Sequence, residues 1–222
     1  MTNKMIEILV SDAQPGKNRM LKETMLLNEA KIPADMNLLN QEMDKNPSLK
    51  RLLNMPAKEL AKNEDLKNYV YLVDEVLPEE NEDNTLLDVI EGCLGYLKKG
   101  HSFFSVNSQN VLRGFMAYAD GKNNCVKQLK MFSFDQKGDA TLYVDLMNFV
   151  IELCSNHTFV SWSAVNINEV NNAYVLAVQK LQKQGFACCI NKSKKTTRYF
   201  VSKECSDEEL NQIAEEFEEK YN

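Results

Sequence analysis

The sequence of 222 residues contains little of several residue types that mark specialised protein classes. It has eight glycines, five prolines, one tryptophan and two histidines, against 44% hydrophobic and 26% charged residues. This composition excludes a fibrous or disordered chain and is typical of a globular protein. No apolar run approaches the ~20 residues that cross a bilayer. The opening segment also lacks the apolar stretch and cleavage site of a secretory signal, so we predict a cytoplasmic protein with no membrane partner.

The six cysteines form no CxxC pair. They lie mostly among apolar neighbours, as reduced core thiols do, and we expect no disulfides. Cys154 and His157 have the spacing of two metal ligands, but no second pair accompanies them, so we predict no metal site. The histidines, His101 and His157, are isolated, and neither is favoured as a catalytic base.

Positive charge is also scarce. Lys and Arg number 26 against 32 Asp and Glu, which gives a net charge of −6 and argues against broad capture of nucleic acid or anionic lipid. We therefore predict no nucleic-acid partner. The basic run Lys192-Ser193-Lys194-Lys195 is a local exception. It indicates a solvated hairpin turn, with contact to phosphates or to an acidic partner as the alternative.

Residues 1–75 differ from the rest of the chain because short amphipathic patterns dominate them. We predict a helical N-terminal region here and a second domain over residues 76–222. The predicted helices are Lys17–Glu29, Asp35–Lys45, Ser48–Leu53 and Pro56–Lys62, and the strand-like runs are Met5–Val10 and Tyr69–Val73.

From residue 85 onward, helical and strand periodicities alternate. The patterns predict a helix at Thr85–Lys99, three meander strands at Ser102–Val106, Val111–Tyr118 and Val126–Phe134, and a helix at Ala140–Cys154. They then predict a strand at Phe159–Val165, a helix at Glu169–Gln184, strands at Phe186–Ile190 and Arg198–Val201, and a final helix at Ser206–Tyr221.

This order over residues 85–201 resembles the GNAT superfamily of acyl-CoA-dependent N-acetyltransferases. Two local matches carry the resemblance: Lys137-Gly138-Asp139-Ala140 before an apolar helix, and Gln184-Gly185-Phe186 before a strand. The resemblance covers about half of the chain. It implies an α+β fold with a GNAT-like mixed central sheet flanked by helices, here with a helical N-terminal extension.

A glycine-bearing turn that opens a helix directs backbone N–H groups and a partial positive charge at one spot, where a pyrophosphate can bind. The family turn reads Arg/Gln-x-x-Gly-x-Gly/Ala, and Gly138 and Ala140 match it, whereas Asp135 occupies the slot of Arg or Gln. The alternative is a turn without a ligand, in which Asp139 caps the helix.

The resemblance also implies that the strands Leu129–Phe134 and Phe159–Val165 splay apart and pair with the pantetheine of acetyl-CoA or another acyl-CoA. The residues expected to bind this cofactor are Met131, Phe132, Ser133, Gln136, Lys137, Gly138, Asp139, Ala140 and Thr141. Core packing is the alternative for each of the aromatic residues.

Acyl transfer to an amine needs an acid that protonates the leaving thiolate. In the family this acid is a tyrosine on the helix after the splayed strand. Counting back from Gly185-Phe186 places the tyrosine slot at Leu181, whereas counting forward from Asn168 brings Tyr174 close to the expected depth. Tyr174 is therefore the candidate acid, and packing is its alternative role.

The leading hypothesis is an acyl-CoA-dependent N-acyltransferase, in which a small-molecule or peptide amine attacks the thioester directly. The acidic charge favours a cationic acceptor such as a polyamine. The alternatives are a catalytically inactive GNAT-like module that binds a ligand or a protein, and an unrelated α+β protein. The oligomeric state is left open, a homodimer included.

Overall fold

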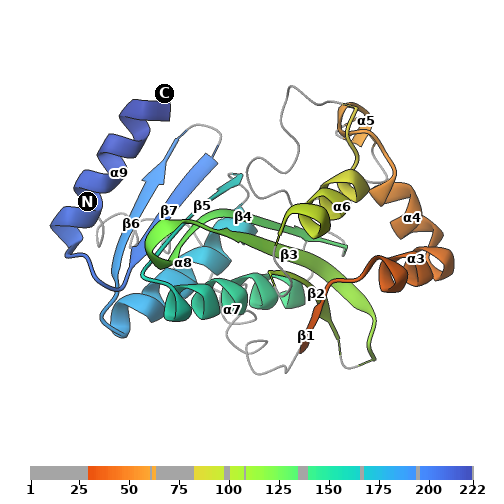
Figure 1. The fold of residues 1–222 in the computed structure, drawn as a ribbon, viewed down its shortest axis with the longest axis horizontal. Coiled ribbons are helices and arrows are strands. Elements are labelled where there is room, and N and C mark those ends of the chain that lie inside the picture. Colours follow the sequence, from red (N-terminus) through yellow and green to blue (C-terminus); the bar gives the residue numbers. More distant parts are fainter. Residues whose placement is uncertain are drawn as a thin grey trace. The chain divides into compact units, whose positions relative to one another are not determined.

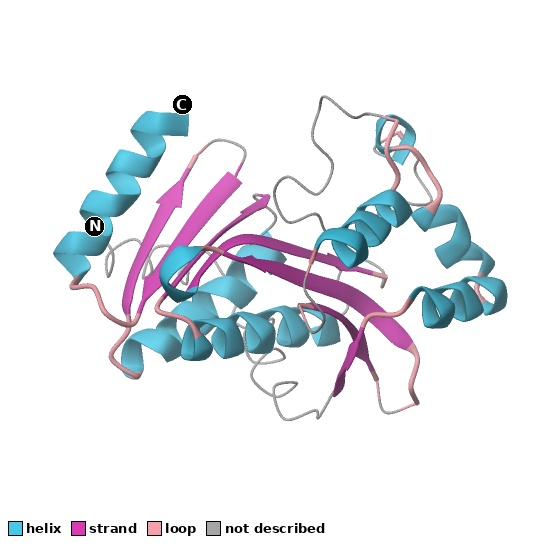
Figure 2. Cartoon of the chain, viewed as in Figure 1, coloured by secondary structure: helices cyan, strands magenta, loops and turns pink. Residues whose placement is uncertain are grey.

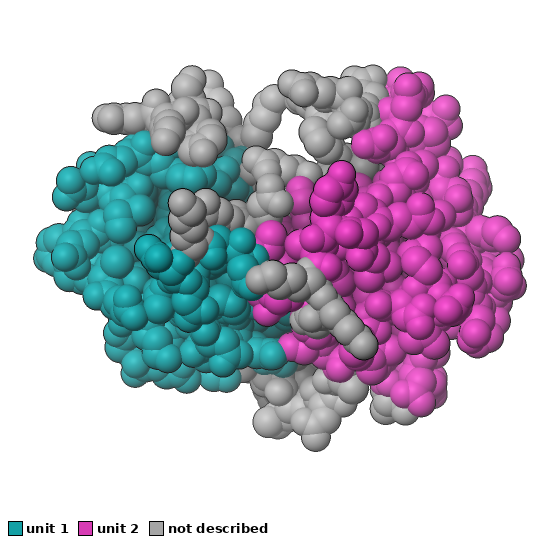
Figure 3. Space-filling view, viewed as in Figure 1, with its two compact units in different colours: residues 1–26, 120–128, 143–222 teal, residues 27–119, 129–142 magenta. Residues whose placement is uncertain are grey.

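The computed structural model of the chain describes residues 30–60, 62–63, 83–97, 101–107, 109–134, 140–165, 168–193 and 196–221 (Figures 1 and 2). Its contacts define two compact units (Figure 3). Unit 1 comprises residues 1–26, 120–128 and 143–222, and unit 2 comprises residues 27–119 and 129–142. The predicted domain boundary after residue 75 lies outside the described residues, as do the elements predicted at Met5–Val10, Lys17–Glu29 and Tyr69–Val73.

Side-chain caps fix the helix starts of unit 2. Its described helices include α3 (Met36–Lys45), α4 (Pro47–Leu53), α5 (Ala57–Leu60) and α6 (Leu86–Tyr96). The Asp35 carboxylate accepts the N–H of Asn37 at 2.7 Å, and Thr85 and Asp88 form a reciprocal capping box before α6. Such caps satisfy N–H groups that a helix start leaves without partners. The predicted helices in these regions are confirmed, with ends shifted by a few residues.

The sheet strands of unit 2 surround an apolar core. They are β1 (Ala30–Pro33), β2 (Ser102–Val106), β3 (Leu112–Asp120) and the second half of β4 (Cys125–Ser133). β1 pairs antiparallel with β2, and β2 pairs antiparallel with β3, so that Phe104 lies opposite Phe115. The Phe104 ring lies 6.0 Å from that of Phe115 and 6.1 Å from that of Phe134, measured between centroids, within the range of aromatic pairs. β1 was not predicted.

Unit 1 contains the first half of β4, followed in hydrogen-bonded order by β5 (Phe159–Val165), β7 (Thr196–Ser202) and β6 (Ala187–Lys192). β4 and β5 are parallel, whereas β7 pairs antiparallel with both β5 and β6. The strands therefore form a mixed arrangement, and the prediction of an α+β fold with a mixed sheet flanked by helices is confirmed.

Helices pack on both faces of the unit 1 strands (Figure 1). The helices of unit 1 are α7 (Ala140–Asn156), which begins in unit 2, α8 (Asn168–Lys183) and α9 (Asp207–Tyr221). α8 contacts β5 and β6, and α9 contacts β6 and β7. Gly185 follows α8 with φ +88°, a conformation that glycine adopts at little cost. The predicted stop of this helix at Gly185 is confirmed.

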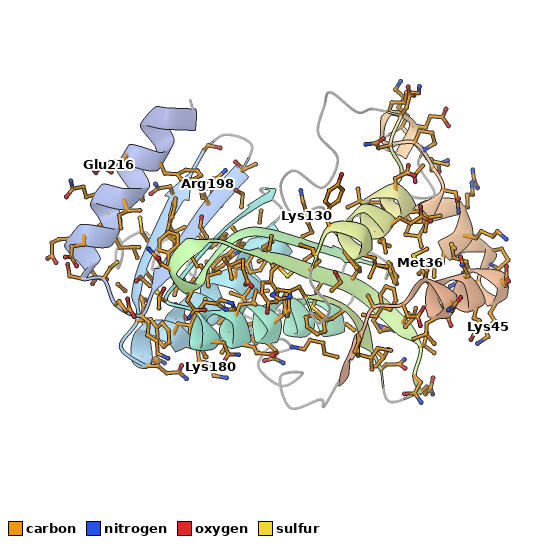
Figure 4. All side chains as sticks on the ribbon, viewed as in Figure 1. Met36, Lys45, Lys130, Lys180, Arg198 and Glu216 are labelled. Atoms are coloured by element: carbon orange, nitrogen blue, oxygen red, sulfur yellow. The ribbon has the colours of Figure 1, made fainter. Side chains whose placement is uncertain are left out.

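Period-2 alternation sends successive side chains of β7 to opposite faces. Phe200 packs edge-on against Phe217 of α9, and Arg198 lies over the same ring, 4.7 Å from its centroid (Figure 4). Tyr199 lies between Arg198 and Phe200 in the sequence, and its ring contacts that of Tyr174 on α8. The unit thus has one aromatic layer under α9 and a second one under α8.

In the ranges that the structure describes, no helix combines the length and the apolar character that crossing a bilayer requires.

Candidate functional site

Three aromatic side chains form a closed cluster between α8 and the strands of unit 1, which we call the aromatic cluster: Trp162, Tyr174 and Tyr199. Trp162 on β5 is the register partner of Tyr199 on β7, and their rings stack with centroids 5.0 Å apart and planes at 7°. The Tyr174 ring lies 5.6 Å from Trp162 and 5.4 Å from Tyr199, tilted to both. All three side chains are buried, with exposures of 3%, 0% and 0%. The predicted candidate acid is therefore part of a tightly packed core.

Two polar atoms of the aromatic cluster have no hydrogen-bond partner among the described residues. Trp162 Nε1 and Tyr174 Oη are both buried, and neither bonds to any residue that the structure describes. Buried polar atoms nearly always have a partner in folded proteins, so each such exception calls for a physical explanation. The three rings of the cluster thus pack against one another, and two of the side chains also carry a buried polar atom without a partner among the described residues.

Burial determines the protonation state of both tyrosines. Desolvation raises the pKa of Tyr174 well above its ordinary value of 10.0, and the neighbouring Tyr199 adds to the shift. Burial likewise raises the pKa of Tyr199. A phenolate would have to give up its hydration in this setting, which disfavours the charged form. Both phenols therefore keep their protons throughout the neutral range, and Tyr174 can donate one.

The predicted cofactor residues follow β4 into α7. Met131 is fully buried in β4. Phe132 and Ser133 continue that strand, and Ala140 and Thr141 begin α7, although the structure describes only their backbone. Gln136, Lys137, Gly138 and Asp139, together with Asp135, lie outside the described residues. The strand β4 and the helix α7 are therefore present where the sequence predicts them, and the turn between them and its phosphate binding stay a prediction.

A backbone hydrogen bond fixes the last residue before this turn. The Phe134 N–H donates to the carbonyl oxygen of Arg113 on β3 at 2.8 Å. The Phe134 ring belongs to the core of unit 2 and packs against Phe104. The chain therefore leaves β4 from a well-anchored position.

β4 and β5 are the parallel pair of unit 1, and the residues in register are Cys125 with Phe159 and Val126 with Val160. These are the first two residues of each strand. Parallel neighbours need a long crossover connection, which here contains α7. The pairing is that of the two strands between which the sequence analysis expects a cofactor.

Neither histidine belongs to the aromatic cluster, and each makes contacts elsewhere in the fold. His157 is 9% exposed; its Nδ1 lies 2.8 Å from the carbonyl oxygen of Leu153, and its Nε2 lies 3.6 Å from a carboxylate oxygen of Asp120. This arrangement ties the end of α7 to the end of β3. The His101 ring packs on Tyr118 with centroids 4.5 Å apart. Both contacts are those of structural histidines.

The cysteines are free thiols. Burial raises the pKa of Cys154, and it raises that of Cys188 to about 12. A protonated, buried thiol is a poor nucleophile and a poor metal ligand. Within the ranges that the structure describes, no group of three or more metal-ligating side chains is present.

The sequence analysis missed Tyr199 because the segment was interpreted as one arm of a basic hairpin. The signal was available: alternation in Thr196–Ser202 puts Tyr199 opposite in direction to Arg198 and Phe200. What the alternation could not show is which strand lies beside it. β5 and Trp162 became its neighbours only because β7 lies between β5 and β6.

Comparisons with known proteins provide little beyond this geometry. No protein-family model matches the sequence, and no curated protein matches it either. Among solved structures, the chain is similar to one described as "Crystal structure of a putative phosphinothricin N-acetyltransferase", at a TM-score of 0.43 and 10% sequence identity. The match covers 81% of this chain and 99% of that chain.

Proposed function

We propose that the protein is an acyl-CoA-dependent N-acyltransferase that transfers an acetyl group from acetyl-CoA to a primary amine. The observation that carries the proposal is the parallel pairing of β4 with β5 among antiparallel neighbours. The sequence resemblance implies that these two strands splay apart and that the cofactor lies between them. The succession of β4 and α7, with Gly138 in the sequence between them, supports the same function.

The turn between β4 and α7 is proposed to hold the pyrophosphate of the cofactor. α7 contains 17 residues, so its first turn carries a full helix dipole. Gly138 leaves room for an anion to approach the backbone, and the free N–H groups of the helix start would donate to its oxygens.

In the proposed reaction, the neutral amine nitrogen attacks the thioester carbon, a C–N bond forms, and the C–S bond breaks. The leaving thiolate takes up the proton of Tyr174 Oη. The nitrogen of the new amide releases a proton to water, and the Tyr174 phenolate regains its proton from that water. Tyr174 suits the role of acid because burial keeps its phenol protonated, as its raised pKa requires. The acceptor is proposed to be cationic, since the chain carries a net charge of −6.

A second candidate function is a GNAT-like module that binds a ligand without catalysis. The burial of Tyr174 favours it, because a side chain of 0% exposure in contact with two other rings has the features of a core residue. Leu181, at the other position that the family count allows for the tyrosine, is equally buried and has no acidic proton.

Calorimetric titration with acetyl-CoA tests the proposal. We expect the wild-type chain to bind with a dissociation constant in the micromolar range and Gly138→Asp to lose binding, because the new carboxylate would repel the pyrophosphate. Gly95→Asp is the matched control. Gly95 is exposed on α6, and a Cβ there meets no atom within 4 Å, so this variant should bind as the wild type does.

Acetylation of a panel of polyamines and lysine-containing peptides then separates the two candidate functions. Binding with turnover supports the enzyme, and binding without turnover supports the inactive module. If the wild-type chain fails to bind acetyl-CoA at high micromolar concentration, or if both aspartate variants bind equally well, the proposal is wrong.

A further inference from the structure

The aromatic cluster contains two buried polar atoms whose hydrogen-bonding capacity is unused within the described chain, Trp162 Nε1 and Tyr174 Oη. They belong to side chains whose rings are in contact, with centroids 5.6 Å apart. They come from different elements, β5 and α8, of the same unit. Both atoms thus lie in one cluster, and neither has a partner among the described residues.

The chemistry of the two atoms defines the partner. An indole N–H can only donate a hydrogen bond, whereas a phenol can donate one and accept another. An oxygen with lone pairs therefore satisfies both, and it can accept from Trp162 and Tyr174 at once. A pure donor, such as an ammonium group, would leave the indole N–H without an acceptor.

The partner is also neutral. The cluster offers neutral groups alone, because burial raises the pKa values of Tyr174 and Tyr199 and both phenols stay protonated. An isolated ion without a counter-charge is strongly disfavoured in such surroundings.

We propose that Trp162 Nε1 and Tyr174 Oη form an internal binding site for one neutral acceptor oxygen. Two sources supply this chemistry: an internal water molecule, or the carbonyl oxygen of an acyl donor bound as proposed above. Internal waters commonly satisfy otherwise unpartnered buried groups of this kind. An internal water molecule at this site would not depend on the proposed function, whereas a bound acyl carbonyl rests on it.

Trp162 is the single tryptophan of the chain, so a ¹H–¹⁵N spectrum contains one indole signal. We expect this signal, in the ligand-free protein at pH 6, to be shifted downfield by hydrogen bonding and to show a cross-relaxation peak with water. The sign of that peak separates a long-lived internal water from chemical exchange with the bulk solvent. A water peak assigns the oxygen to internal water.

Addition of acetyl-CoA tests the other source. If the ligand-free indole shows no water peak but moves downfield with saturation on addition of acetyl-CoA, the oxygen is a carbonyl of the ligand. Calorimetry reports independently whether acetyl-CoA binds. If it does not bind, the proposed function fails, but the indole signal still tests whether an internal water occupies the site. An indole signal at the position of a non-bonded N–H, without a water peak and unmoved by acetyl-CoA, overturns the proposal.

Two matched variants assign the site to its atoms. Tyr174→Phe removes Oη and keeps the ring, and we expect it to shift the indole signal upfield and to weaken the water peak at least twofold. Tyr199→Phe keeps the ring that stacks on Trp162 and leaves both proposed ligands of the oxygen in place. We expect it to retain the water peak. Equal effects of the two variants would contradict a site at Tyr174.

Discussion

Trp162 and Tyr199 lie opposite each other on β5 and β7, with ring planes only 7° apart and centroids separated by 5.0 Å. A stacked pair in register joins the two strands through their side chains as well as through their backbones. Cross-strand aromatic pairs of this kind add to the stability of a sheet beyond the area that they bury. The pair therefore anchors β7, the strand to which β6 is attached.

Truncation of this pair should destabilise the protein strongly. We expect Trp162→Ala to lower the free energy of unfolding by about 3–5 kcal/mol, because it leaves a large cavity in a packed core. The measurement is urea unfolding followed by far-UV circular dichroism. Ile213→Ala on α9 is the control, since its side chain is 37% exposed and such changes shift stability by less than about 0.5 kcal/mol. Similar losses in both variants would contradict the packing described here.

Alkaline pH should destabilise the folded state through the buried tyrosines. The pKa of Tyr174 is raised above its ordinary value of 10.0 in the folded chain. The contribution of Tyr174 to the free energy of unfolding is therefore complete below about pH 10. It falls as the pH increases beyond that value, because the unfolded chain releases the tyrosine proton at a lower pH than the folded chain does. Phenolate absorbance at 295 nm and circular dichroism should therefore report part of the tyrosine ionisation together with unfolding. Tyr174→Phe should make the decline of stability with pH shallower.

The start of α9 should respond to acid. Ser206 donates its backbone N–H to the Glu209 carboxylate at 2.8 Å, and Ser206 Oγ accepts the Glu209 N–H at 3.2 Å. The hydrogen bonds from Ser206 lower the pKa of Glu209 below its ordinary value of 4.5. The cap therefore contributes fully above that value and is lost as pH falls through the lowered pKa.

Carbon-detected NMR titration of the Glu209 carboxyl group checks this expectation. Ser206→Ala should move the pKa of Glu209 upward and should fray the first turn of α9. Ser155→Ala is the control, because Ser155 Oγ donates to the Ile151 carbonyl inside α7 and caps no helix start. A Glu209 pKa that does not respond to Ser206→Ala would show that the Ser206 side chain does not contribute to the lowered pKa, and that the backbone N–H alone accounts for it.

If the proposed function is correct, Tyr174→Phe should lower kcat by roughly 10²-fold or more, the usual contribution of a general acid. Because burial raises the pKa of Tyr174, kcat of the wild type should show no alkaline decline from this residue below about pH 10. A thioester of a more acidic thiol needs less help on departure, so it should recover activity in the variant. Tyr199→Phe, which keeps the ring, should retain kcat. An unchanged kcat in Tyr174→Phe would assign the residue to packing alone.

Much of the fold could be predicted from local patterns. Thr85 with Asp88, Ser206 with Glu209, and Gly185 mark helix ends through contacts within a few residues, and the structure contains each of these features. β1 could not be found this way. Its four residues end in Pro33, and they form a strand only because β2, some 70 residues later, supplies the partner.

The candidate site was less predictable than the fold. Counting back from Gly185-Phe186 selects Leu181, whereas counting forward from Asn168 only brings Tyr174 close to the expected depth. Both side chains are fully buried, so burial does not choose between them. The contact with Trp162 and Tyr199 distinguishes Tyr174, and it depends on the position of β7 beside β5. Strand order is a long-range property, and no short window of sequence contains it.

The place of β7 between β5 and β6 also constrains synthesis on the ribosome. β5 is followed by about 30 residues before β7 begins, and β6 emerges first without a neighbour to pair with. Until Thr196–Ser202 has been translated, the apolar segment Phe159–Val165 keeps an open hydrogen-bonding edge, of the kind that recruits other chains. The nascent chain is therefore most prone to aggregation in the interval after Phe159–Val165 has been made and before Thr196–Ser202 is added.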